Sequence, residues 1–197
     1  MFVQVIEGRT SDAEGLKRQG ERWDDDVRAG AVGFLGVTAG VADDGRAITI
    51  ARFESESAAR ANSERPEQAS WWADTAKYYD GDISFNESSD VVEFLGGGSD
   101  EAGFVQVMKV AGVDRAFVER LHASFQELAD LRPDLMGGLR VWTGPDRYVE
   151  AAYFTSEAEA RAGESVELPE AVQATMADFQ KILANTEFID LRDPTLR

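Results

Sequence analysis

An arginine and a glutamate are predicted to face each other across a hairpin in the second half of this chain. Arg140 and Glu150 flank the turn Gly144-Pro145-Asp146, and the alternation of strand side chains puts both on one face, with Trp142 and Tyr148. Opposite charges at such positions favour an ion pair, which is costly to bury unless hydrogen bonds complete it. Two interpretations follow. One is a site where a polar ligand binds between the two sheets, and the other is a solvated pair at the sheet rim beside plain aromatic packing.

Two glutamines occupy the same place in two copies of one short motif. The chain reads FVQV at residues 2–5 and again at residues 104–107. Gln4 and Gln106 each stand in the middle of an otherwise apolar strand, where a buried amide must find a hydrogen-bond partner. That partner is either a group within the protein or a bound substrate.

Aromatic residues at helical spacing form a third candidate group. Trp71 and Tyr78 are seven residues apart, as are Trp72 and Tyr79, so each pair shares a face of a predicted helix. One pair is expected to pack on the sheet, and the other to cover a pocket mouth or an oligomer interface. No residue is a convincing general base, so the catalytic residues stay unknown. The candidate ligand-binding residues are Gln4, Gln106, Arg140, Trp142, Tyr148, Glu150, Trp71 and Trp72.

The composition argues against several kinds of metal and cofactor chemistry. There is no cysteine, hence no disulfide framework and no thiolate metal site. The single histidine, His122, leaves haem ligation as a minor alternative to the prediction of no cofactor. The acidic run Asp24-Asp25-Asp26 is interpreted as a solvated helix face, because consecutive helical residues point in different directions.

The charge of the chain limits its partners. The formal net charge is −17, which repels nucleic-acid phosphates and anionic membrane surfaces. No apolar run approaches the roughly 20 residues of a membrane span, and the first residues lack a basic signal-peptide region. These features predict a cytoplasmic protein that binds neither nucleic acid nor membranes.

Longer matches between the two halves show that the whole chain is a tandem repeat. FESESAARA at residues 53–61 aligns with FTSEAEARA at residues 154–162, at an offset of 101. Gly33, Leu35 and Val37 match Gly137, Leu139 and Val141 at an offset of 104. The predicted organisation is a first repeat over 1–95, a glycine-rich linker over 96–103 and a second repeat over 104–197.

Each repeat is predicted to have the element order β-α-β-β-α-β. Capping boxes at Ser11 and Glu14, and at Ser156 and Glu159, mark helix starts. Pro66 and Pro169 divide the second helix of each repeat into a short and a longer part. Val91–Leu95 is a candidate edge strand of the first repeat. The predicted strands are Phe2–Ile6, Gly33–Ala39, Arg46–Phe53 and Ile83–Asn86, then Phe104–Val110, Met136–Thr143, Arg147–Phe154 and Glu187–Leu191.

Strand parity divides each sheet into two faces. The uniformly apolar face that includes Val3, Val5, Ile48 and Ile50 is assigned to the helices. The opposite face is then assigned to an interior shared by the two repeats. On that face the first repeat carries small, neutral residues that leave room, whereas the second carries large, polar ones.

This element order is that of ferredoxin-like folds, here α+β with antiparallel sheets. With FVQV, the F-x-S-E-x-x-A-R-A helix start and the second-helix tryptophans, it resembles the dimeric α+β barrel superfamily, which includes the antibiotic-biosynthesis-monooxygenase-like domains. The resemblance covers nearly the whole chain and implies a fused two-repeat form, a pseudo-dimer that is a monomer or pairs as a homodimer. The G-G-G-S-D-x-A-G-F-V-Q-V junction is similar to that of actinobacterial proteins of this type. In haem-degrading members the iron-binding histidine is on the second helix, which His122 does not match.

Three functions fit these observations. The first is a small-molecule-binding barrel that acts as a cofactor-independent, monooxygenase-like enzyme on an aromatic or polyketide-like substrate. The second is a non-catalytic binding protein, and the third is a structural protein with a filled core. The sequence leaves open whether the protein is an enzyme, because one fold supports many functions.

Overall fold

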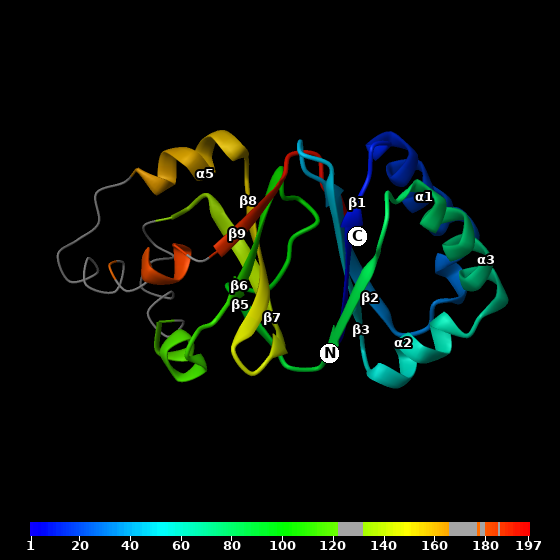
Figure 1. Cartoon of the computed structure of the whole chain (residues 1–197), viewed down its shortest axis with the longest axis horizontal. Helices are drawn as coiled ribbons and strands as arrows, with labels where there is room; N and C mark the ends of the chain where they lie inside the picture. The colour runs from blue at the N-terminus through cyan, green and yellow to red at the C-terminus, as the bar shows by residue number, and fades with distance from the viewer. Residues whose placement is uncertain (122–131, 166–176, 178–179, 185) are drawn as a thin grey trace. The chain divides into compact units, whose positions relative to one another are not determined.

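The computed structural model describes residues 1–121, 132–165, 177, 180–184 and 186–197 (Figure 1). The chain forms two compact units. Unit 1 comprises Met1–Val91 with Asp193–Arg197, and unit 2 comprises Val92–Arg192. His122 and Pro169 lie outside the described residues.

Unit 1 is a five-stranded antiparallel sheet with its helices on one face (Figure 1). The strand order is β10-β2-β3-β1-β4. Trp23 and Val27, which follow Leu16 at helical spacing, are buried, as this amphipathic pattern requires. The strands are β1 (Phe2–Arg9), β2 (Phe34–Val41), β3 (Arg46–Phe53), β4 (Ser84–Ser88) and β10 (Thr195–Leu196). The helices are α1 (Ala13–Asp26), α2 (Glu56–Ser63) and α3 (Pro66–Thr75), with 3₁₀ turns η1 (Arg28–Gly30) and η2 (Ala76–Tyr78).

Unit 2 repeats the same pattern with the strand order β5-β7-β8-β6-β9. Residues 115–121 are helical, and α5 (Glu157–Glu164) begins at the predicted capping box, since the Ser156 hydroxyl accepts from the Glu159 amide at 3.2 Å. The fold class, two tandem ferredoxin-like repeats with antiparallel sheets, is confirmed. The strands are β5 (Val91–Phe94), β6 (Phe104–Ala111), β7 (Leu135–Gly144), β8 (Arg147–Phe154) and β9 (Thr186–Leu191).

Two local predictions were wrong. The candidate edge strand of the first repeat, Val91–Leu95, forms β5, which pairs instead with β7 in the sheet of unit 2. Strand β10 from the end of the chain takes the corresponding edge beside β2. The cap of α1 is Asp12 rather than Ser11, because the Asp12 carboxylate accepts from the Gly15 amide at 2.8 Å. Asp12 and Ser11 are both good caps, so sequence alone does not choose between neighbours.

The assignment of the sheet faces was also wrong. Phe2 and Phe53 pack on Ala59 of α2, so the face expected to line an interior shared by the repeats is the face that the helices cover. In unit 2, Phe104 and Phe154 are in one buried cluster with Ala160 of α5. Both faces carry apolar residues, so hydrophobicity could not distinguish them.

A β-bulge in the second strand of each repeat corrects the repeat alignment. The register shifts between Phe34 and Gly36 in β2, and between Leu135 and Gly137 in β7. The two bulge glycines are therefore equivalent at an offset of 101, rather than the 104 suggested by sequence matches in this strand. After the bulge, Val37, Ala39 and Val41 of β2 are paired with Ala51, Thr49 and Ala47 of β3.

We predict that Gly36→Ala destabilises the protein by about 2 kcal/mol or more, since Gly36 has φ +154° and a Cβ there would meet the carbonyl oxygen of Arg197. Gly20→Ala in α1 is the control: no atom lies within 4 Å of its Cβ position, so it should be neutral or stabilise by up to about 1 kcal/mol. Urea unfolding measures both. Equal effects of the two substitutions would contradict the assigned strain.

Candidate functional site

A cavity of about 290 Å³ lies within unit 1, between the sheet and its helices. Its floor is formed by side chains of β2 and β3, including Ala39, Ala47 and Thr49, and its walls by α1 and α3. This volume is at the lower end of the range for small-molecule sites, roughly 300–1,000 Å³. The cavity therefore suits a compact ligand.

A continuous series of aromatic rings borders this cavity. Trp23 of α1 contacts Phe34 of β2 with ring centroids 4.7 Å apart, and Trp71 of α3 at 6.5 Å. Trp71 contacts Trp72 at 6.0 Å, and Trp72 contacts Tyr79 at 6.2 Å. All five residues are in the cavity lining, and the tilted and edge-on geometries are those that aromatic pairs prefer. We call this series the aromatic wall.

Hydrogen bonds from the indole nitrogens fix two of these rings. Trp71 Nε1 donates to the carbonyl oxygen of Gln19 at 2.8 Å, which ties α3 to α1. Trp23 Nε1 donates to Gln68 Oε1, also at 2.8 Å. With their only donors satisfied, both rings present apolar surface to the cavity.

The polar side chains of the lining are largely engaged with the protein itself. Thr75 Oγ1 donates to the Trp71 carbonyl oxygen at 2.9 Å, and Ser63 Oγ to the Ala59 carbonyl oxygen at 3.0 Å. Tyr79 is partly buried, and the resulting desolvation raises its pKa, while a hydrogen bond with Thr49 acts in the opposite direction. Tyr79 therefore stays a neutral phenol near pH 7, and the cavity interior is mostly apolar.

Two ion pairs join α1 to the end of the chain at the border of the cavity. Lys17 pairs with Asp193, and Asp24 pairs with Arg197. The side chains of the Lys17–Asp193 pair are 42% and 79% exposed, so this pair contributes little to stability and lies where the site meets solvent. Charge is thus found at the border of the cavity rather than inside it.

Large side chains in unit 2 occupy the positions equivalent to this cavity floor. The cross-strand pair Ala39 and Thr49 of unit 1 is equivalent to Arg140 and Glu150. The pair Val41 and Ala47 is equivalent to Trp142 and Tyr148. The contrast predicted from sequence, small residues in one repeat and large polar ones in the other, is confirmed, but on the helix-covered faces.

The Arg140–Glu150 pair is deeply buried. Arg140 Nε donates to Glu150 Oε2 at 2.6 Å, the Nη2 to Oε2 distance is 2.5 Å, and the residues are only 2% and 3% exposed. The interpretation as a solvated pair at the sheet rim is therefore wrong. The guanidinium also lies 4.7 Å from the centre of the Tyr148 ring.

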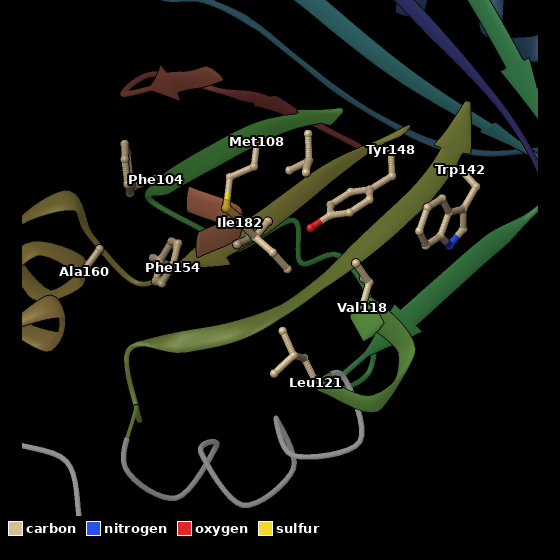
Figure 2. Close-up of a cluster of buried hydrophobic side chains, with 11 residues drawn as sticks. Phe104, Met108, Val118, Leu121, Trp142, Tyr148, Phe154, Ala160 and Ile182 are labelled. Atoms are coloured by element: carbon tan, nitrogen blue, oxygen red, sulfur yellow. The ribbon is translucent and has the colours of Figure 1, made fainter. Parts of the chain in front are cut away.

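The two aromatic residues beside this pair belong to the core of unit 2. Trp142 and Tyr148 stack edge to face at 5.1 Å within a cluster that includes Val118 and Leu121 (Figure 2). Burial, and secondarily the charge of Glu150, raises the pKa of Tyr148 far above its ordinary value. Among the described residues, Trp142 Nε1 has no hydrogen-bond partner. We call Arg140, Trp142, Tyr148 and Glu150 the polar plug.

The two glutamines of the FVQV motifs have equivalent structural partners. Gln4 Nε2 donates to Glu87 on the neighbouring strand β4 at 2.7 Å, and Gln106 Nε2 donates to Asp190 on β9 at 3.1 Å. These are the structural hydrogen bonds that the sequence offered as one alternative. Gln4 also borders the cavity of unit 1.

The structure thus divides the predicted site residues between two places. Gln4, Trp71 and Trp72 border the cavity, whereas Gln106 and the polar plug belong to unit 2. Sequence reasoning missed Trp23 and Gln68 as site residues. Trp23 lies at helical spacing from Leu16, a pattern that by itself indicates only a buried helix face, and nothing local marks Gln68.

Two absences apply to the described part of the chain. It contains no cluster of three or more His, Asp or Glu side chains able to hold a metal ion. None of its helices has the length and apolar character needed to cross a membrane.

We predict that Ala47→Tyr, which places in unit 1 the residue found at the equivalent Tyr148 of the polar plug, fills the cavity. Binding of an aromatic ligand should weaken at least tenfold, about 1.4 kcal/mol, because the ligand loses its contacts with the cavity wall. Ala73→Tyr, on the exposed side of α3, is the control and should bind like the unchanged protein. Equilibrium dialysis with a fused-ring aromatic compound measures both. Undiminished binding by the Ala47 variant would contradict this location for the site.

A second prediction concerns the polar plug. Arg140→Met should cost about 3–5 kcal/mol, because it leaves the Glu150 charge buried without its partner. Arg140→Met combined with Glu150→Leu should cost clearly less, since no buried charge remains. Urea unfolding of both variants provides the comparison. If the double variant were less stable than the single one, the unpaired charge of Glu150 would not be the cause of the loss, and the prediction would be contradicted.

Comparisons with known proteins place this geometry among solved structures. No protein-family model and no curated protein matches the chain. Two bacterial proteins named "putative monooxygenase" match over its whole length at 10% identity. The Lactobacillus acidophilus protein has a TM-score of 0.70 with 98% of its chain covered, and the Fusobacterium nucleatum protein has 0.76 with 93% covered. An anthrone oxidase-like protein matches the whole chain at 12% identity and TM-score 0.68, with 92% of its chain covered. The resemblance inferred from the sequence is confirmed as a likeness of fold: the chain has the fold of these monooxygenase-like proteins across both of its repeats.

Proposed function

We propose that unit 1 binds a flat aromatic or polyketide-like small molecule in its cavity and oxidises it with O₂, without a cofactor. The observation that carries the proposal is the aromatic wall around a cavity of about 290 Å³. Rings such as Trp23, Trp71 and Trp72 offer large apolar faces that stack on a planar ligand.

The distribution of polarity in unit 1 supports a largely apolar ligand. Thr49, Thr75 and Tyr79 already hydrogen-bond to other protein groups, so few of their donors are free. Charged residues such as Lys17 and Asp193 are at the border of the cavity. A ligand of this kind would enter past charges and bury its rings against the aromatic wall.

The proposed reaction converts a methylene group that is conjugated with a ketone through aromatic rings, as in anthrone, into a second carbonyl. The carbon loses two hydrogens and gains one oxygen atom, while the other oxygen atom of O₂ leaves as water with those hydrogens. The substrate supplies all four electrons, so no external reductant is needed. Loss of the first proton gives an enolate that passes an electron to O₂. The carboxylates of Glu14 and Asp193 are among the residues that border the cavity.

The chain contributes binding, orientation and exclusion of water to such a reaction. An apolar enclosure protects an electron-rich enolate from bulk water and holds it in one orientation. The sequence has one histidine and no cysteine, so it is poor in imidazole and thiolate ligands for a redox metal. The anthrone oxidase-like protein that shares the fold guides the choice of anthrone as the test substrate.

We predict that the protein accelerates O₂ uptake in the presence of anthrone at pH 7, with one O₂ consumed for each anthraquinone formed. An oxygen electrode and chromatography of the product measure the two quantities, against a blank without protein. Ala47→Tyr should reduce the rate to that of the blank, whereas Ala73→Tyr should retain it.

The other outcomes separate the competing functions. Anthrone binding without accelerated O₂ uptake would identify unit 1 as a non-catalytic binding module. Absence of both binding and uptake would contradict the proposed function and favour a structural role.

A further inference from the structure

Gln68 of α3 borders the cavity and belongs to a short chain of hydrogen bonds that reaches from α1 to α3. Arg65 Nη1 donates to Asn62 Oδ1 at 2.9 Å and to the Val27 carbonyl oxygen at 3.1 Å. Asn62 Nδ2 donates to Gln68 Oε1 at 3.2 Å, and Trp23 Nε1 donates to the same oxygen at 2.8 Å.

Both ends of this chain fix the orientation of its amides. A guanidinium and an indole N–H can only donate hydrogen bonds, so the atoms that face them must be amide oxygens. Arg65 therefore sets Oδ1 of Asn62 toward itself and turns Nδ2 toward Gln68. Trp23 independently requires Oε1 of Gln68 at the same point, so the two constraints agree.

The consequence is a free pair of donors on Gln68. Its oxygen accepts two hydrogen bonds, which uses both lone pairs. Its amide nitrogen, Nε2, has no partner among the described residues. By contrast, Nε2 of Gln4, the other glutamine that borders the cavity, already donates to Glu87 at 2.7 Å.

We propose that Gln68 Nε2 donates a hydrogen bond to a ketone, quinone or enolate oxygen of the aromatic ligand. This inference rests on the proposed function and narrows it, because it assigns the substrate an acceptor oxygen beside its rings. In a mostly apolar cavity, one prearranged donor selects ligands strongly by the presence of that oxygen. The same N–H strengthens its bond as the oxygen gains charge in the enolate.

The test compares 1-tetralone with tetralin, two ligands with the same fused rings that differ in one carbonyl oxygen. Equilibrium dialysis of the full chain gives both affinities. Gln68→Glu keeps an oxygen for Trp23 and Asn62 but replaces the donor nitrogen. It should weaken binding of the ketone relative to the hydrocarbon about three- to tenfold, the value of one neutral hydrogen bond.

Two further variants keep the test decisive. Gln68→Met removes the donor without adding charge. It should lower the ratio of 1-tetralone affinity to tetralin affinity in the same direction, and it replaces the glutamate variant if that variant does not fold. Gln180→Met, the matched control at an exposed glutamine of unit 2, should leave the ratio of the two affinities within about twofold of that of the unchanged protein, since this residue does not border the cavity.

The outcomes separate this inference from the function on which it rests. Binding of both ligands with a ratio unaffected at Gln68 would overturn the role of its amide and leave the cavity as an aromatic site. An equal shift in the Gln180 variant would overturn the assignment to Gln68. Failure of the unchanged protein to bind either ligand would overturn the proposed function and this inference with it.

Discussion

The contact between Trp23 and Phe34, with ring centroids 4.7 Å apart, joins α1 to the sheet of unit 1 and begins the aromatic wall. Trp71 packs on the same tryptophan and hydrogen-bonds to the backbone of α1 at Gln19. Helices α1 and α3 are thereby held together over a floor of small residues such as Ala39 and Ala47. A tight core would need larger side chains on that floor, so this combination leaves a cavity.

In the second repeat, the equivalent backbone positions carry large side chains instead of small ones. Arg140 and Glu150 neutralise one another in a space that Ala39 and Thr49 leave open in unit 1. Burying such a pair is expensive compared with apolar packing of the same volume. We interpret the difference as a divergence after duplication, in which unit 1 has small residues around its cavity and unit 2 has large side chains at the equivalent positions.

Much of the architecture could be predicted because it depends on local patterns. The FVQV repeat, the capping box at Ser156 and the hairpin turns each encode their own element, and the Arg140–Glu150 pairing followed from the length of one hairpin. The faces of the sheets could not be assigned, since Val5 and Phe2 are both apolar and only helix packing distinguishes them. The exchange of β5 and β10 between sheets depends on contacts far apart in sequence.

The candidate site was predictable only in part for the same reason. Trp71 and Trp72 were recognisable as an aromatic group, but the partners that complete the wall, Trp23 and Phe34, come from other elements. The orientation of Gln68 depends on donor-only groups contributed by α1 and by the segment between α2 and α3. Such an arrangement becomes visible only when the elements are assembled.

The central claim is that unit 1 holds a ligand site, whereas the polar plug occupies the equivalent positions in unit 2. Calorimetric titration of the full chain with a planar aromatic ketone measures the number of sites directly. The account predicts one ligand bound per chain. Two equivalent sites would contradict the role of the polar plug, and no binding at all would contradict the cavity of unit 1 as a site for such molecules.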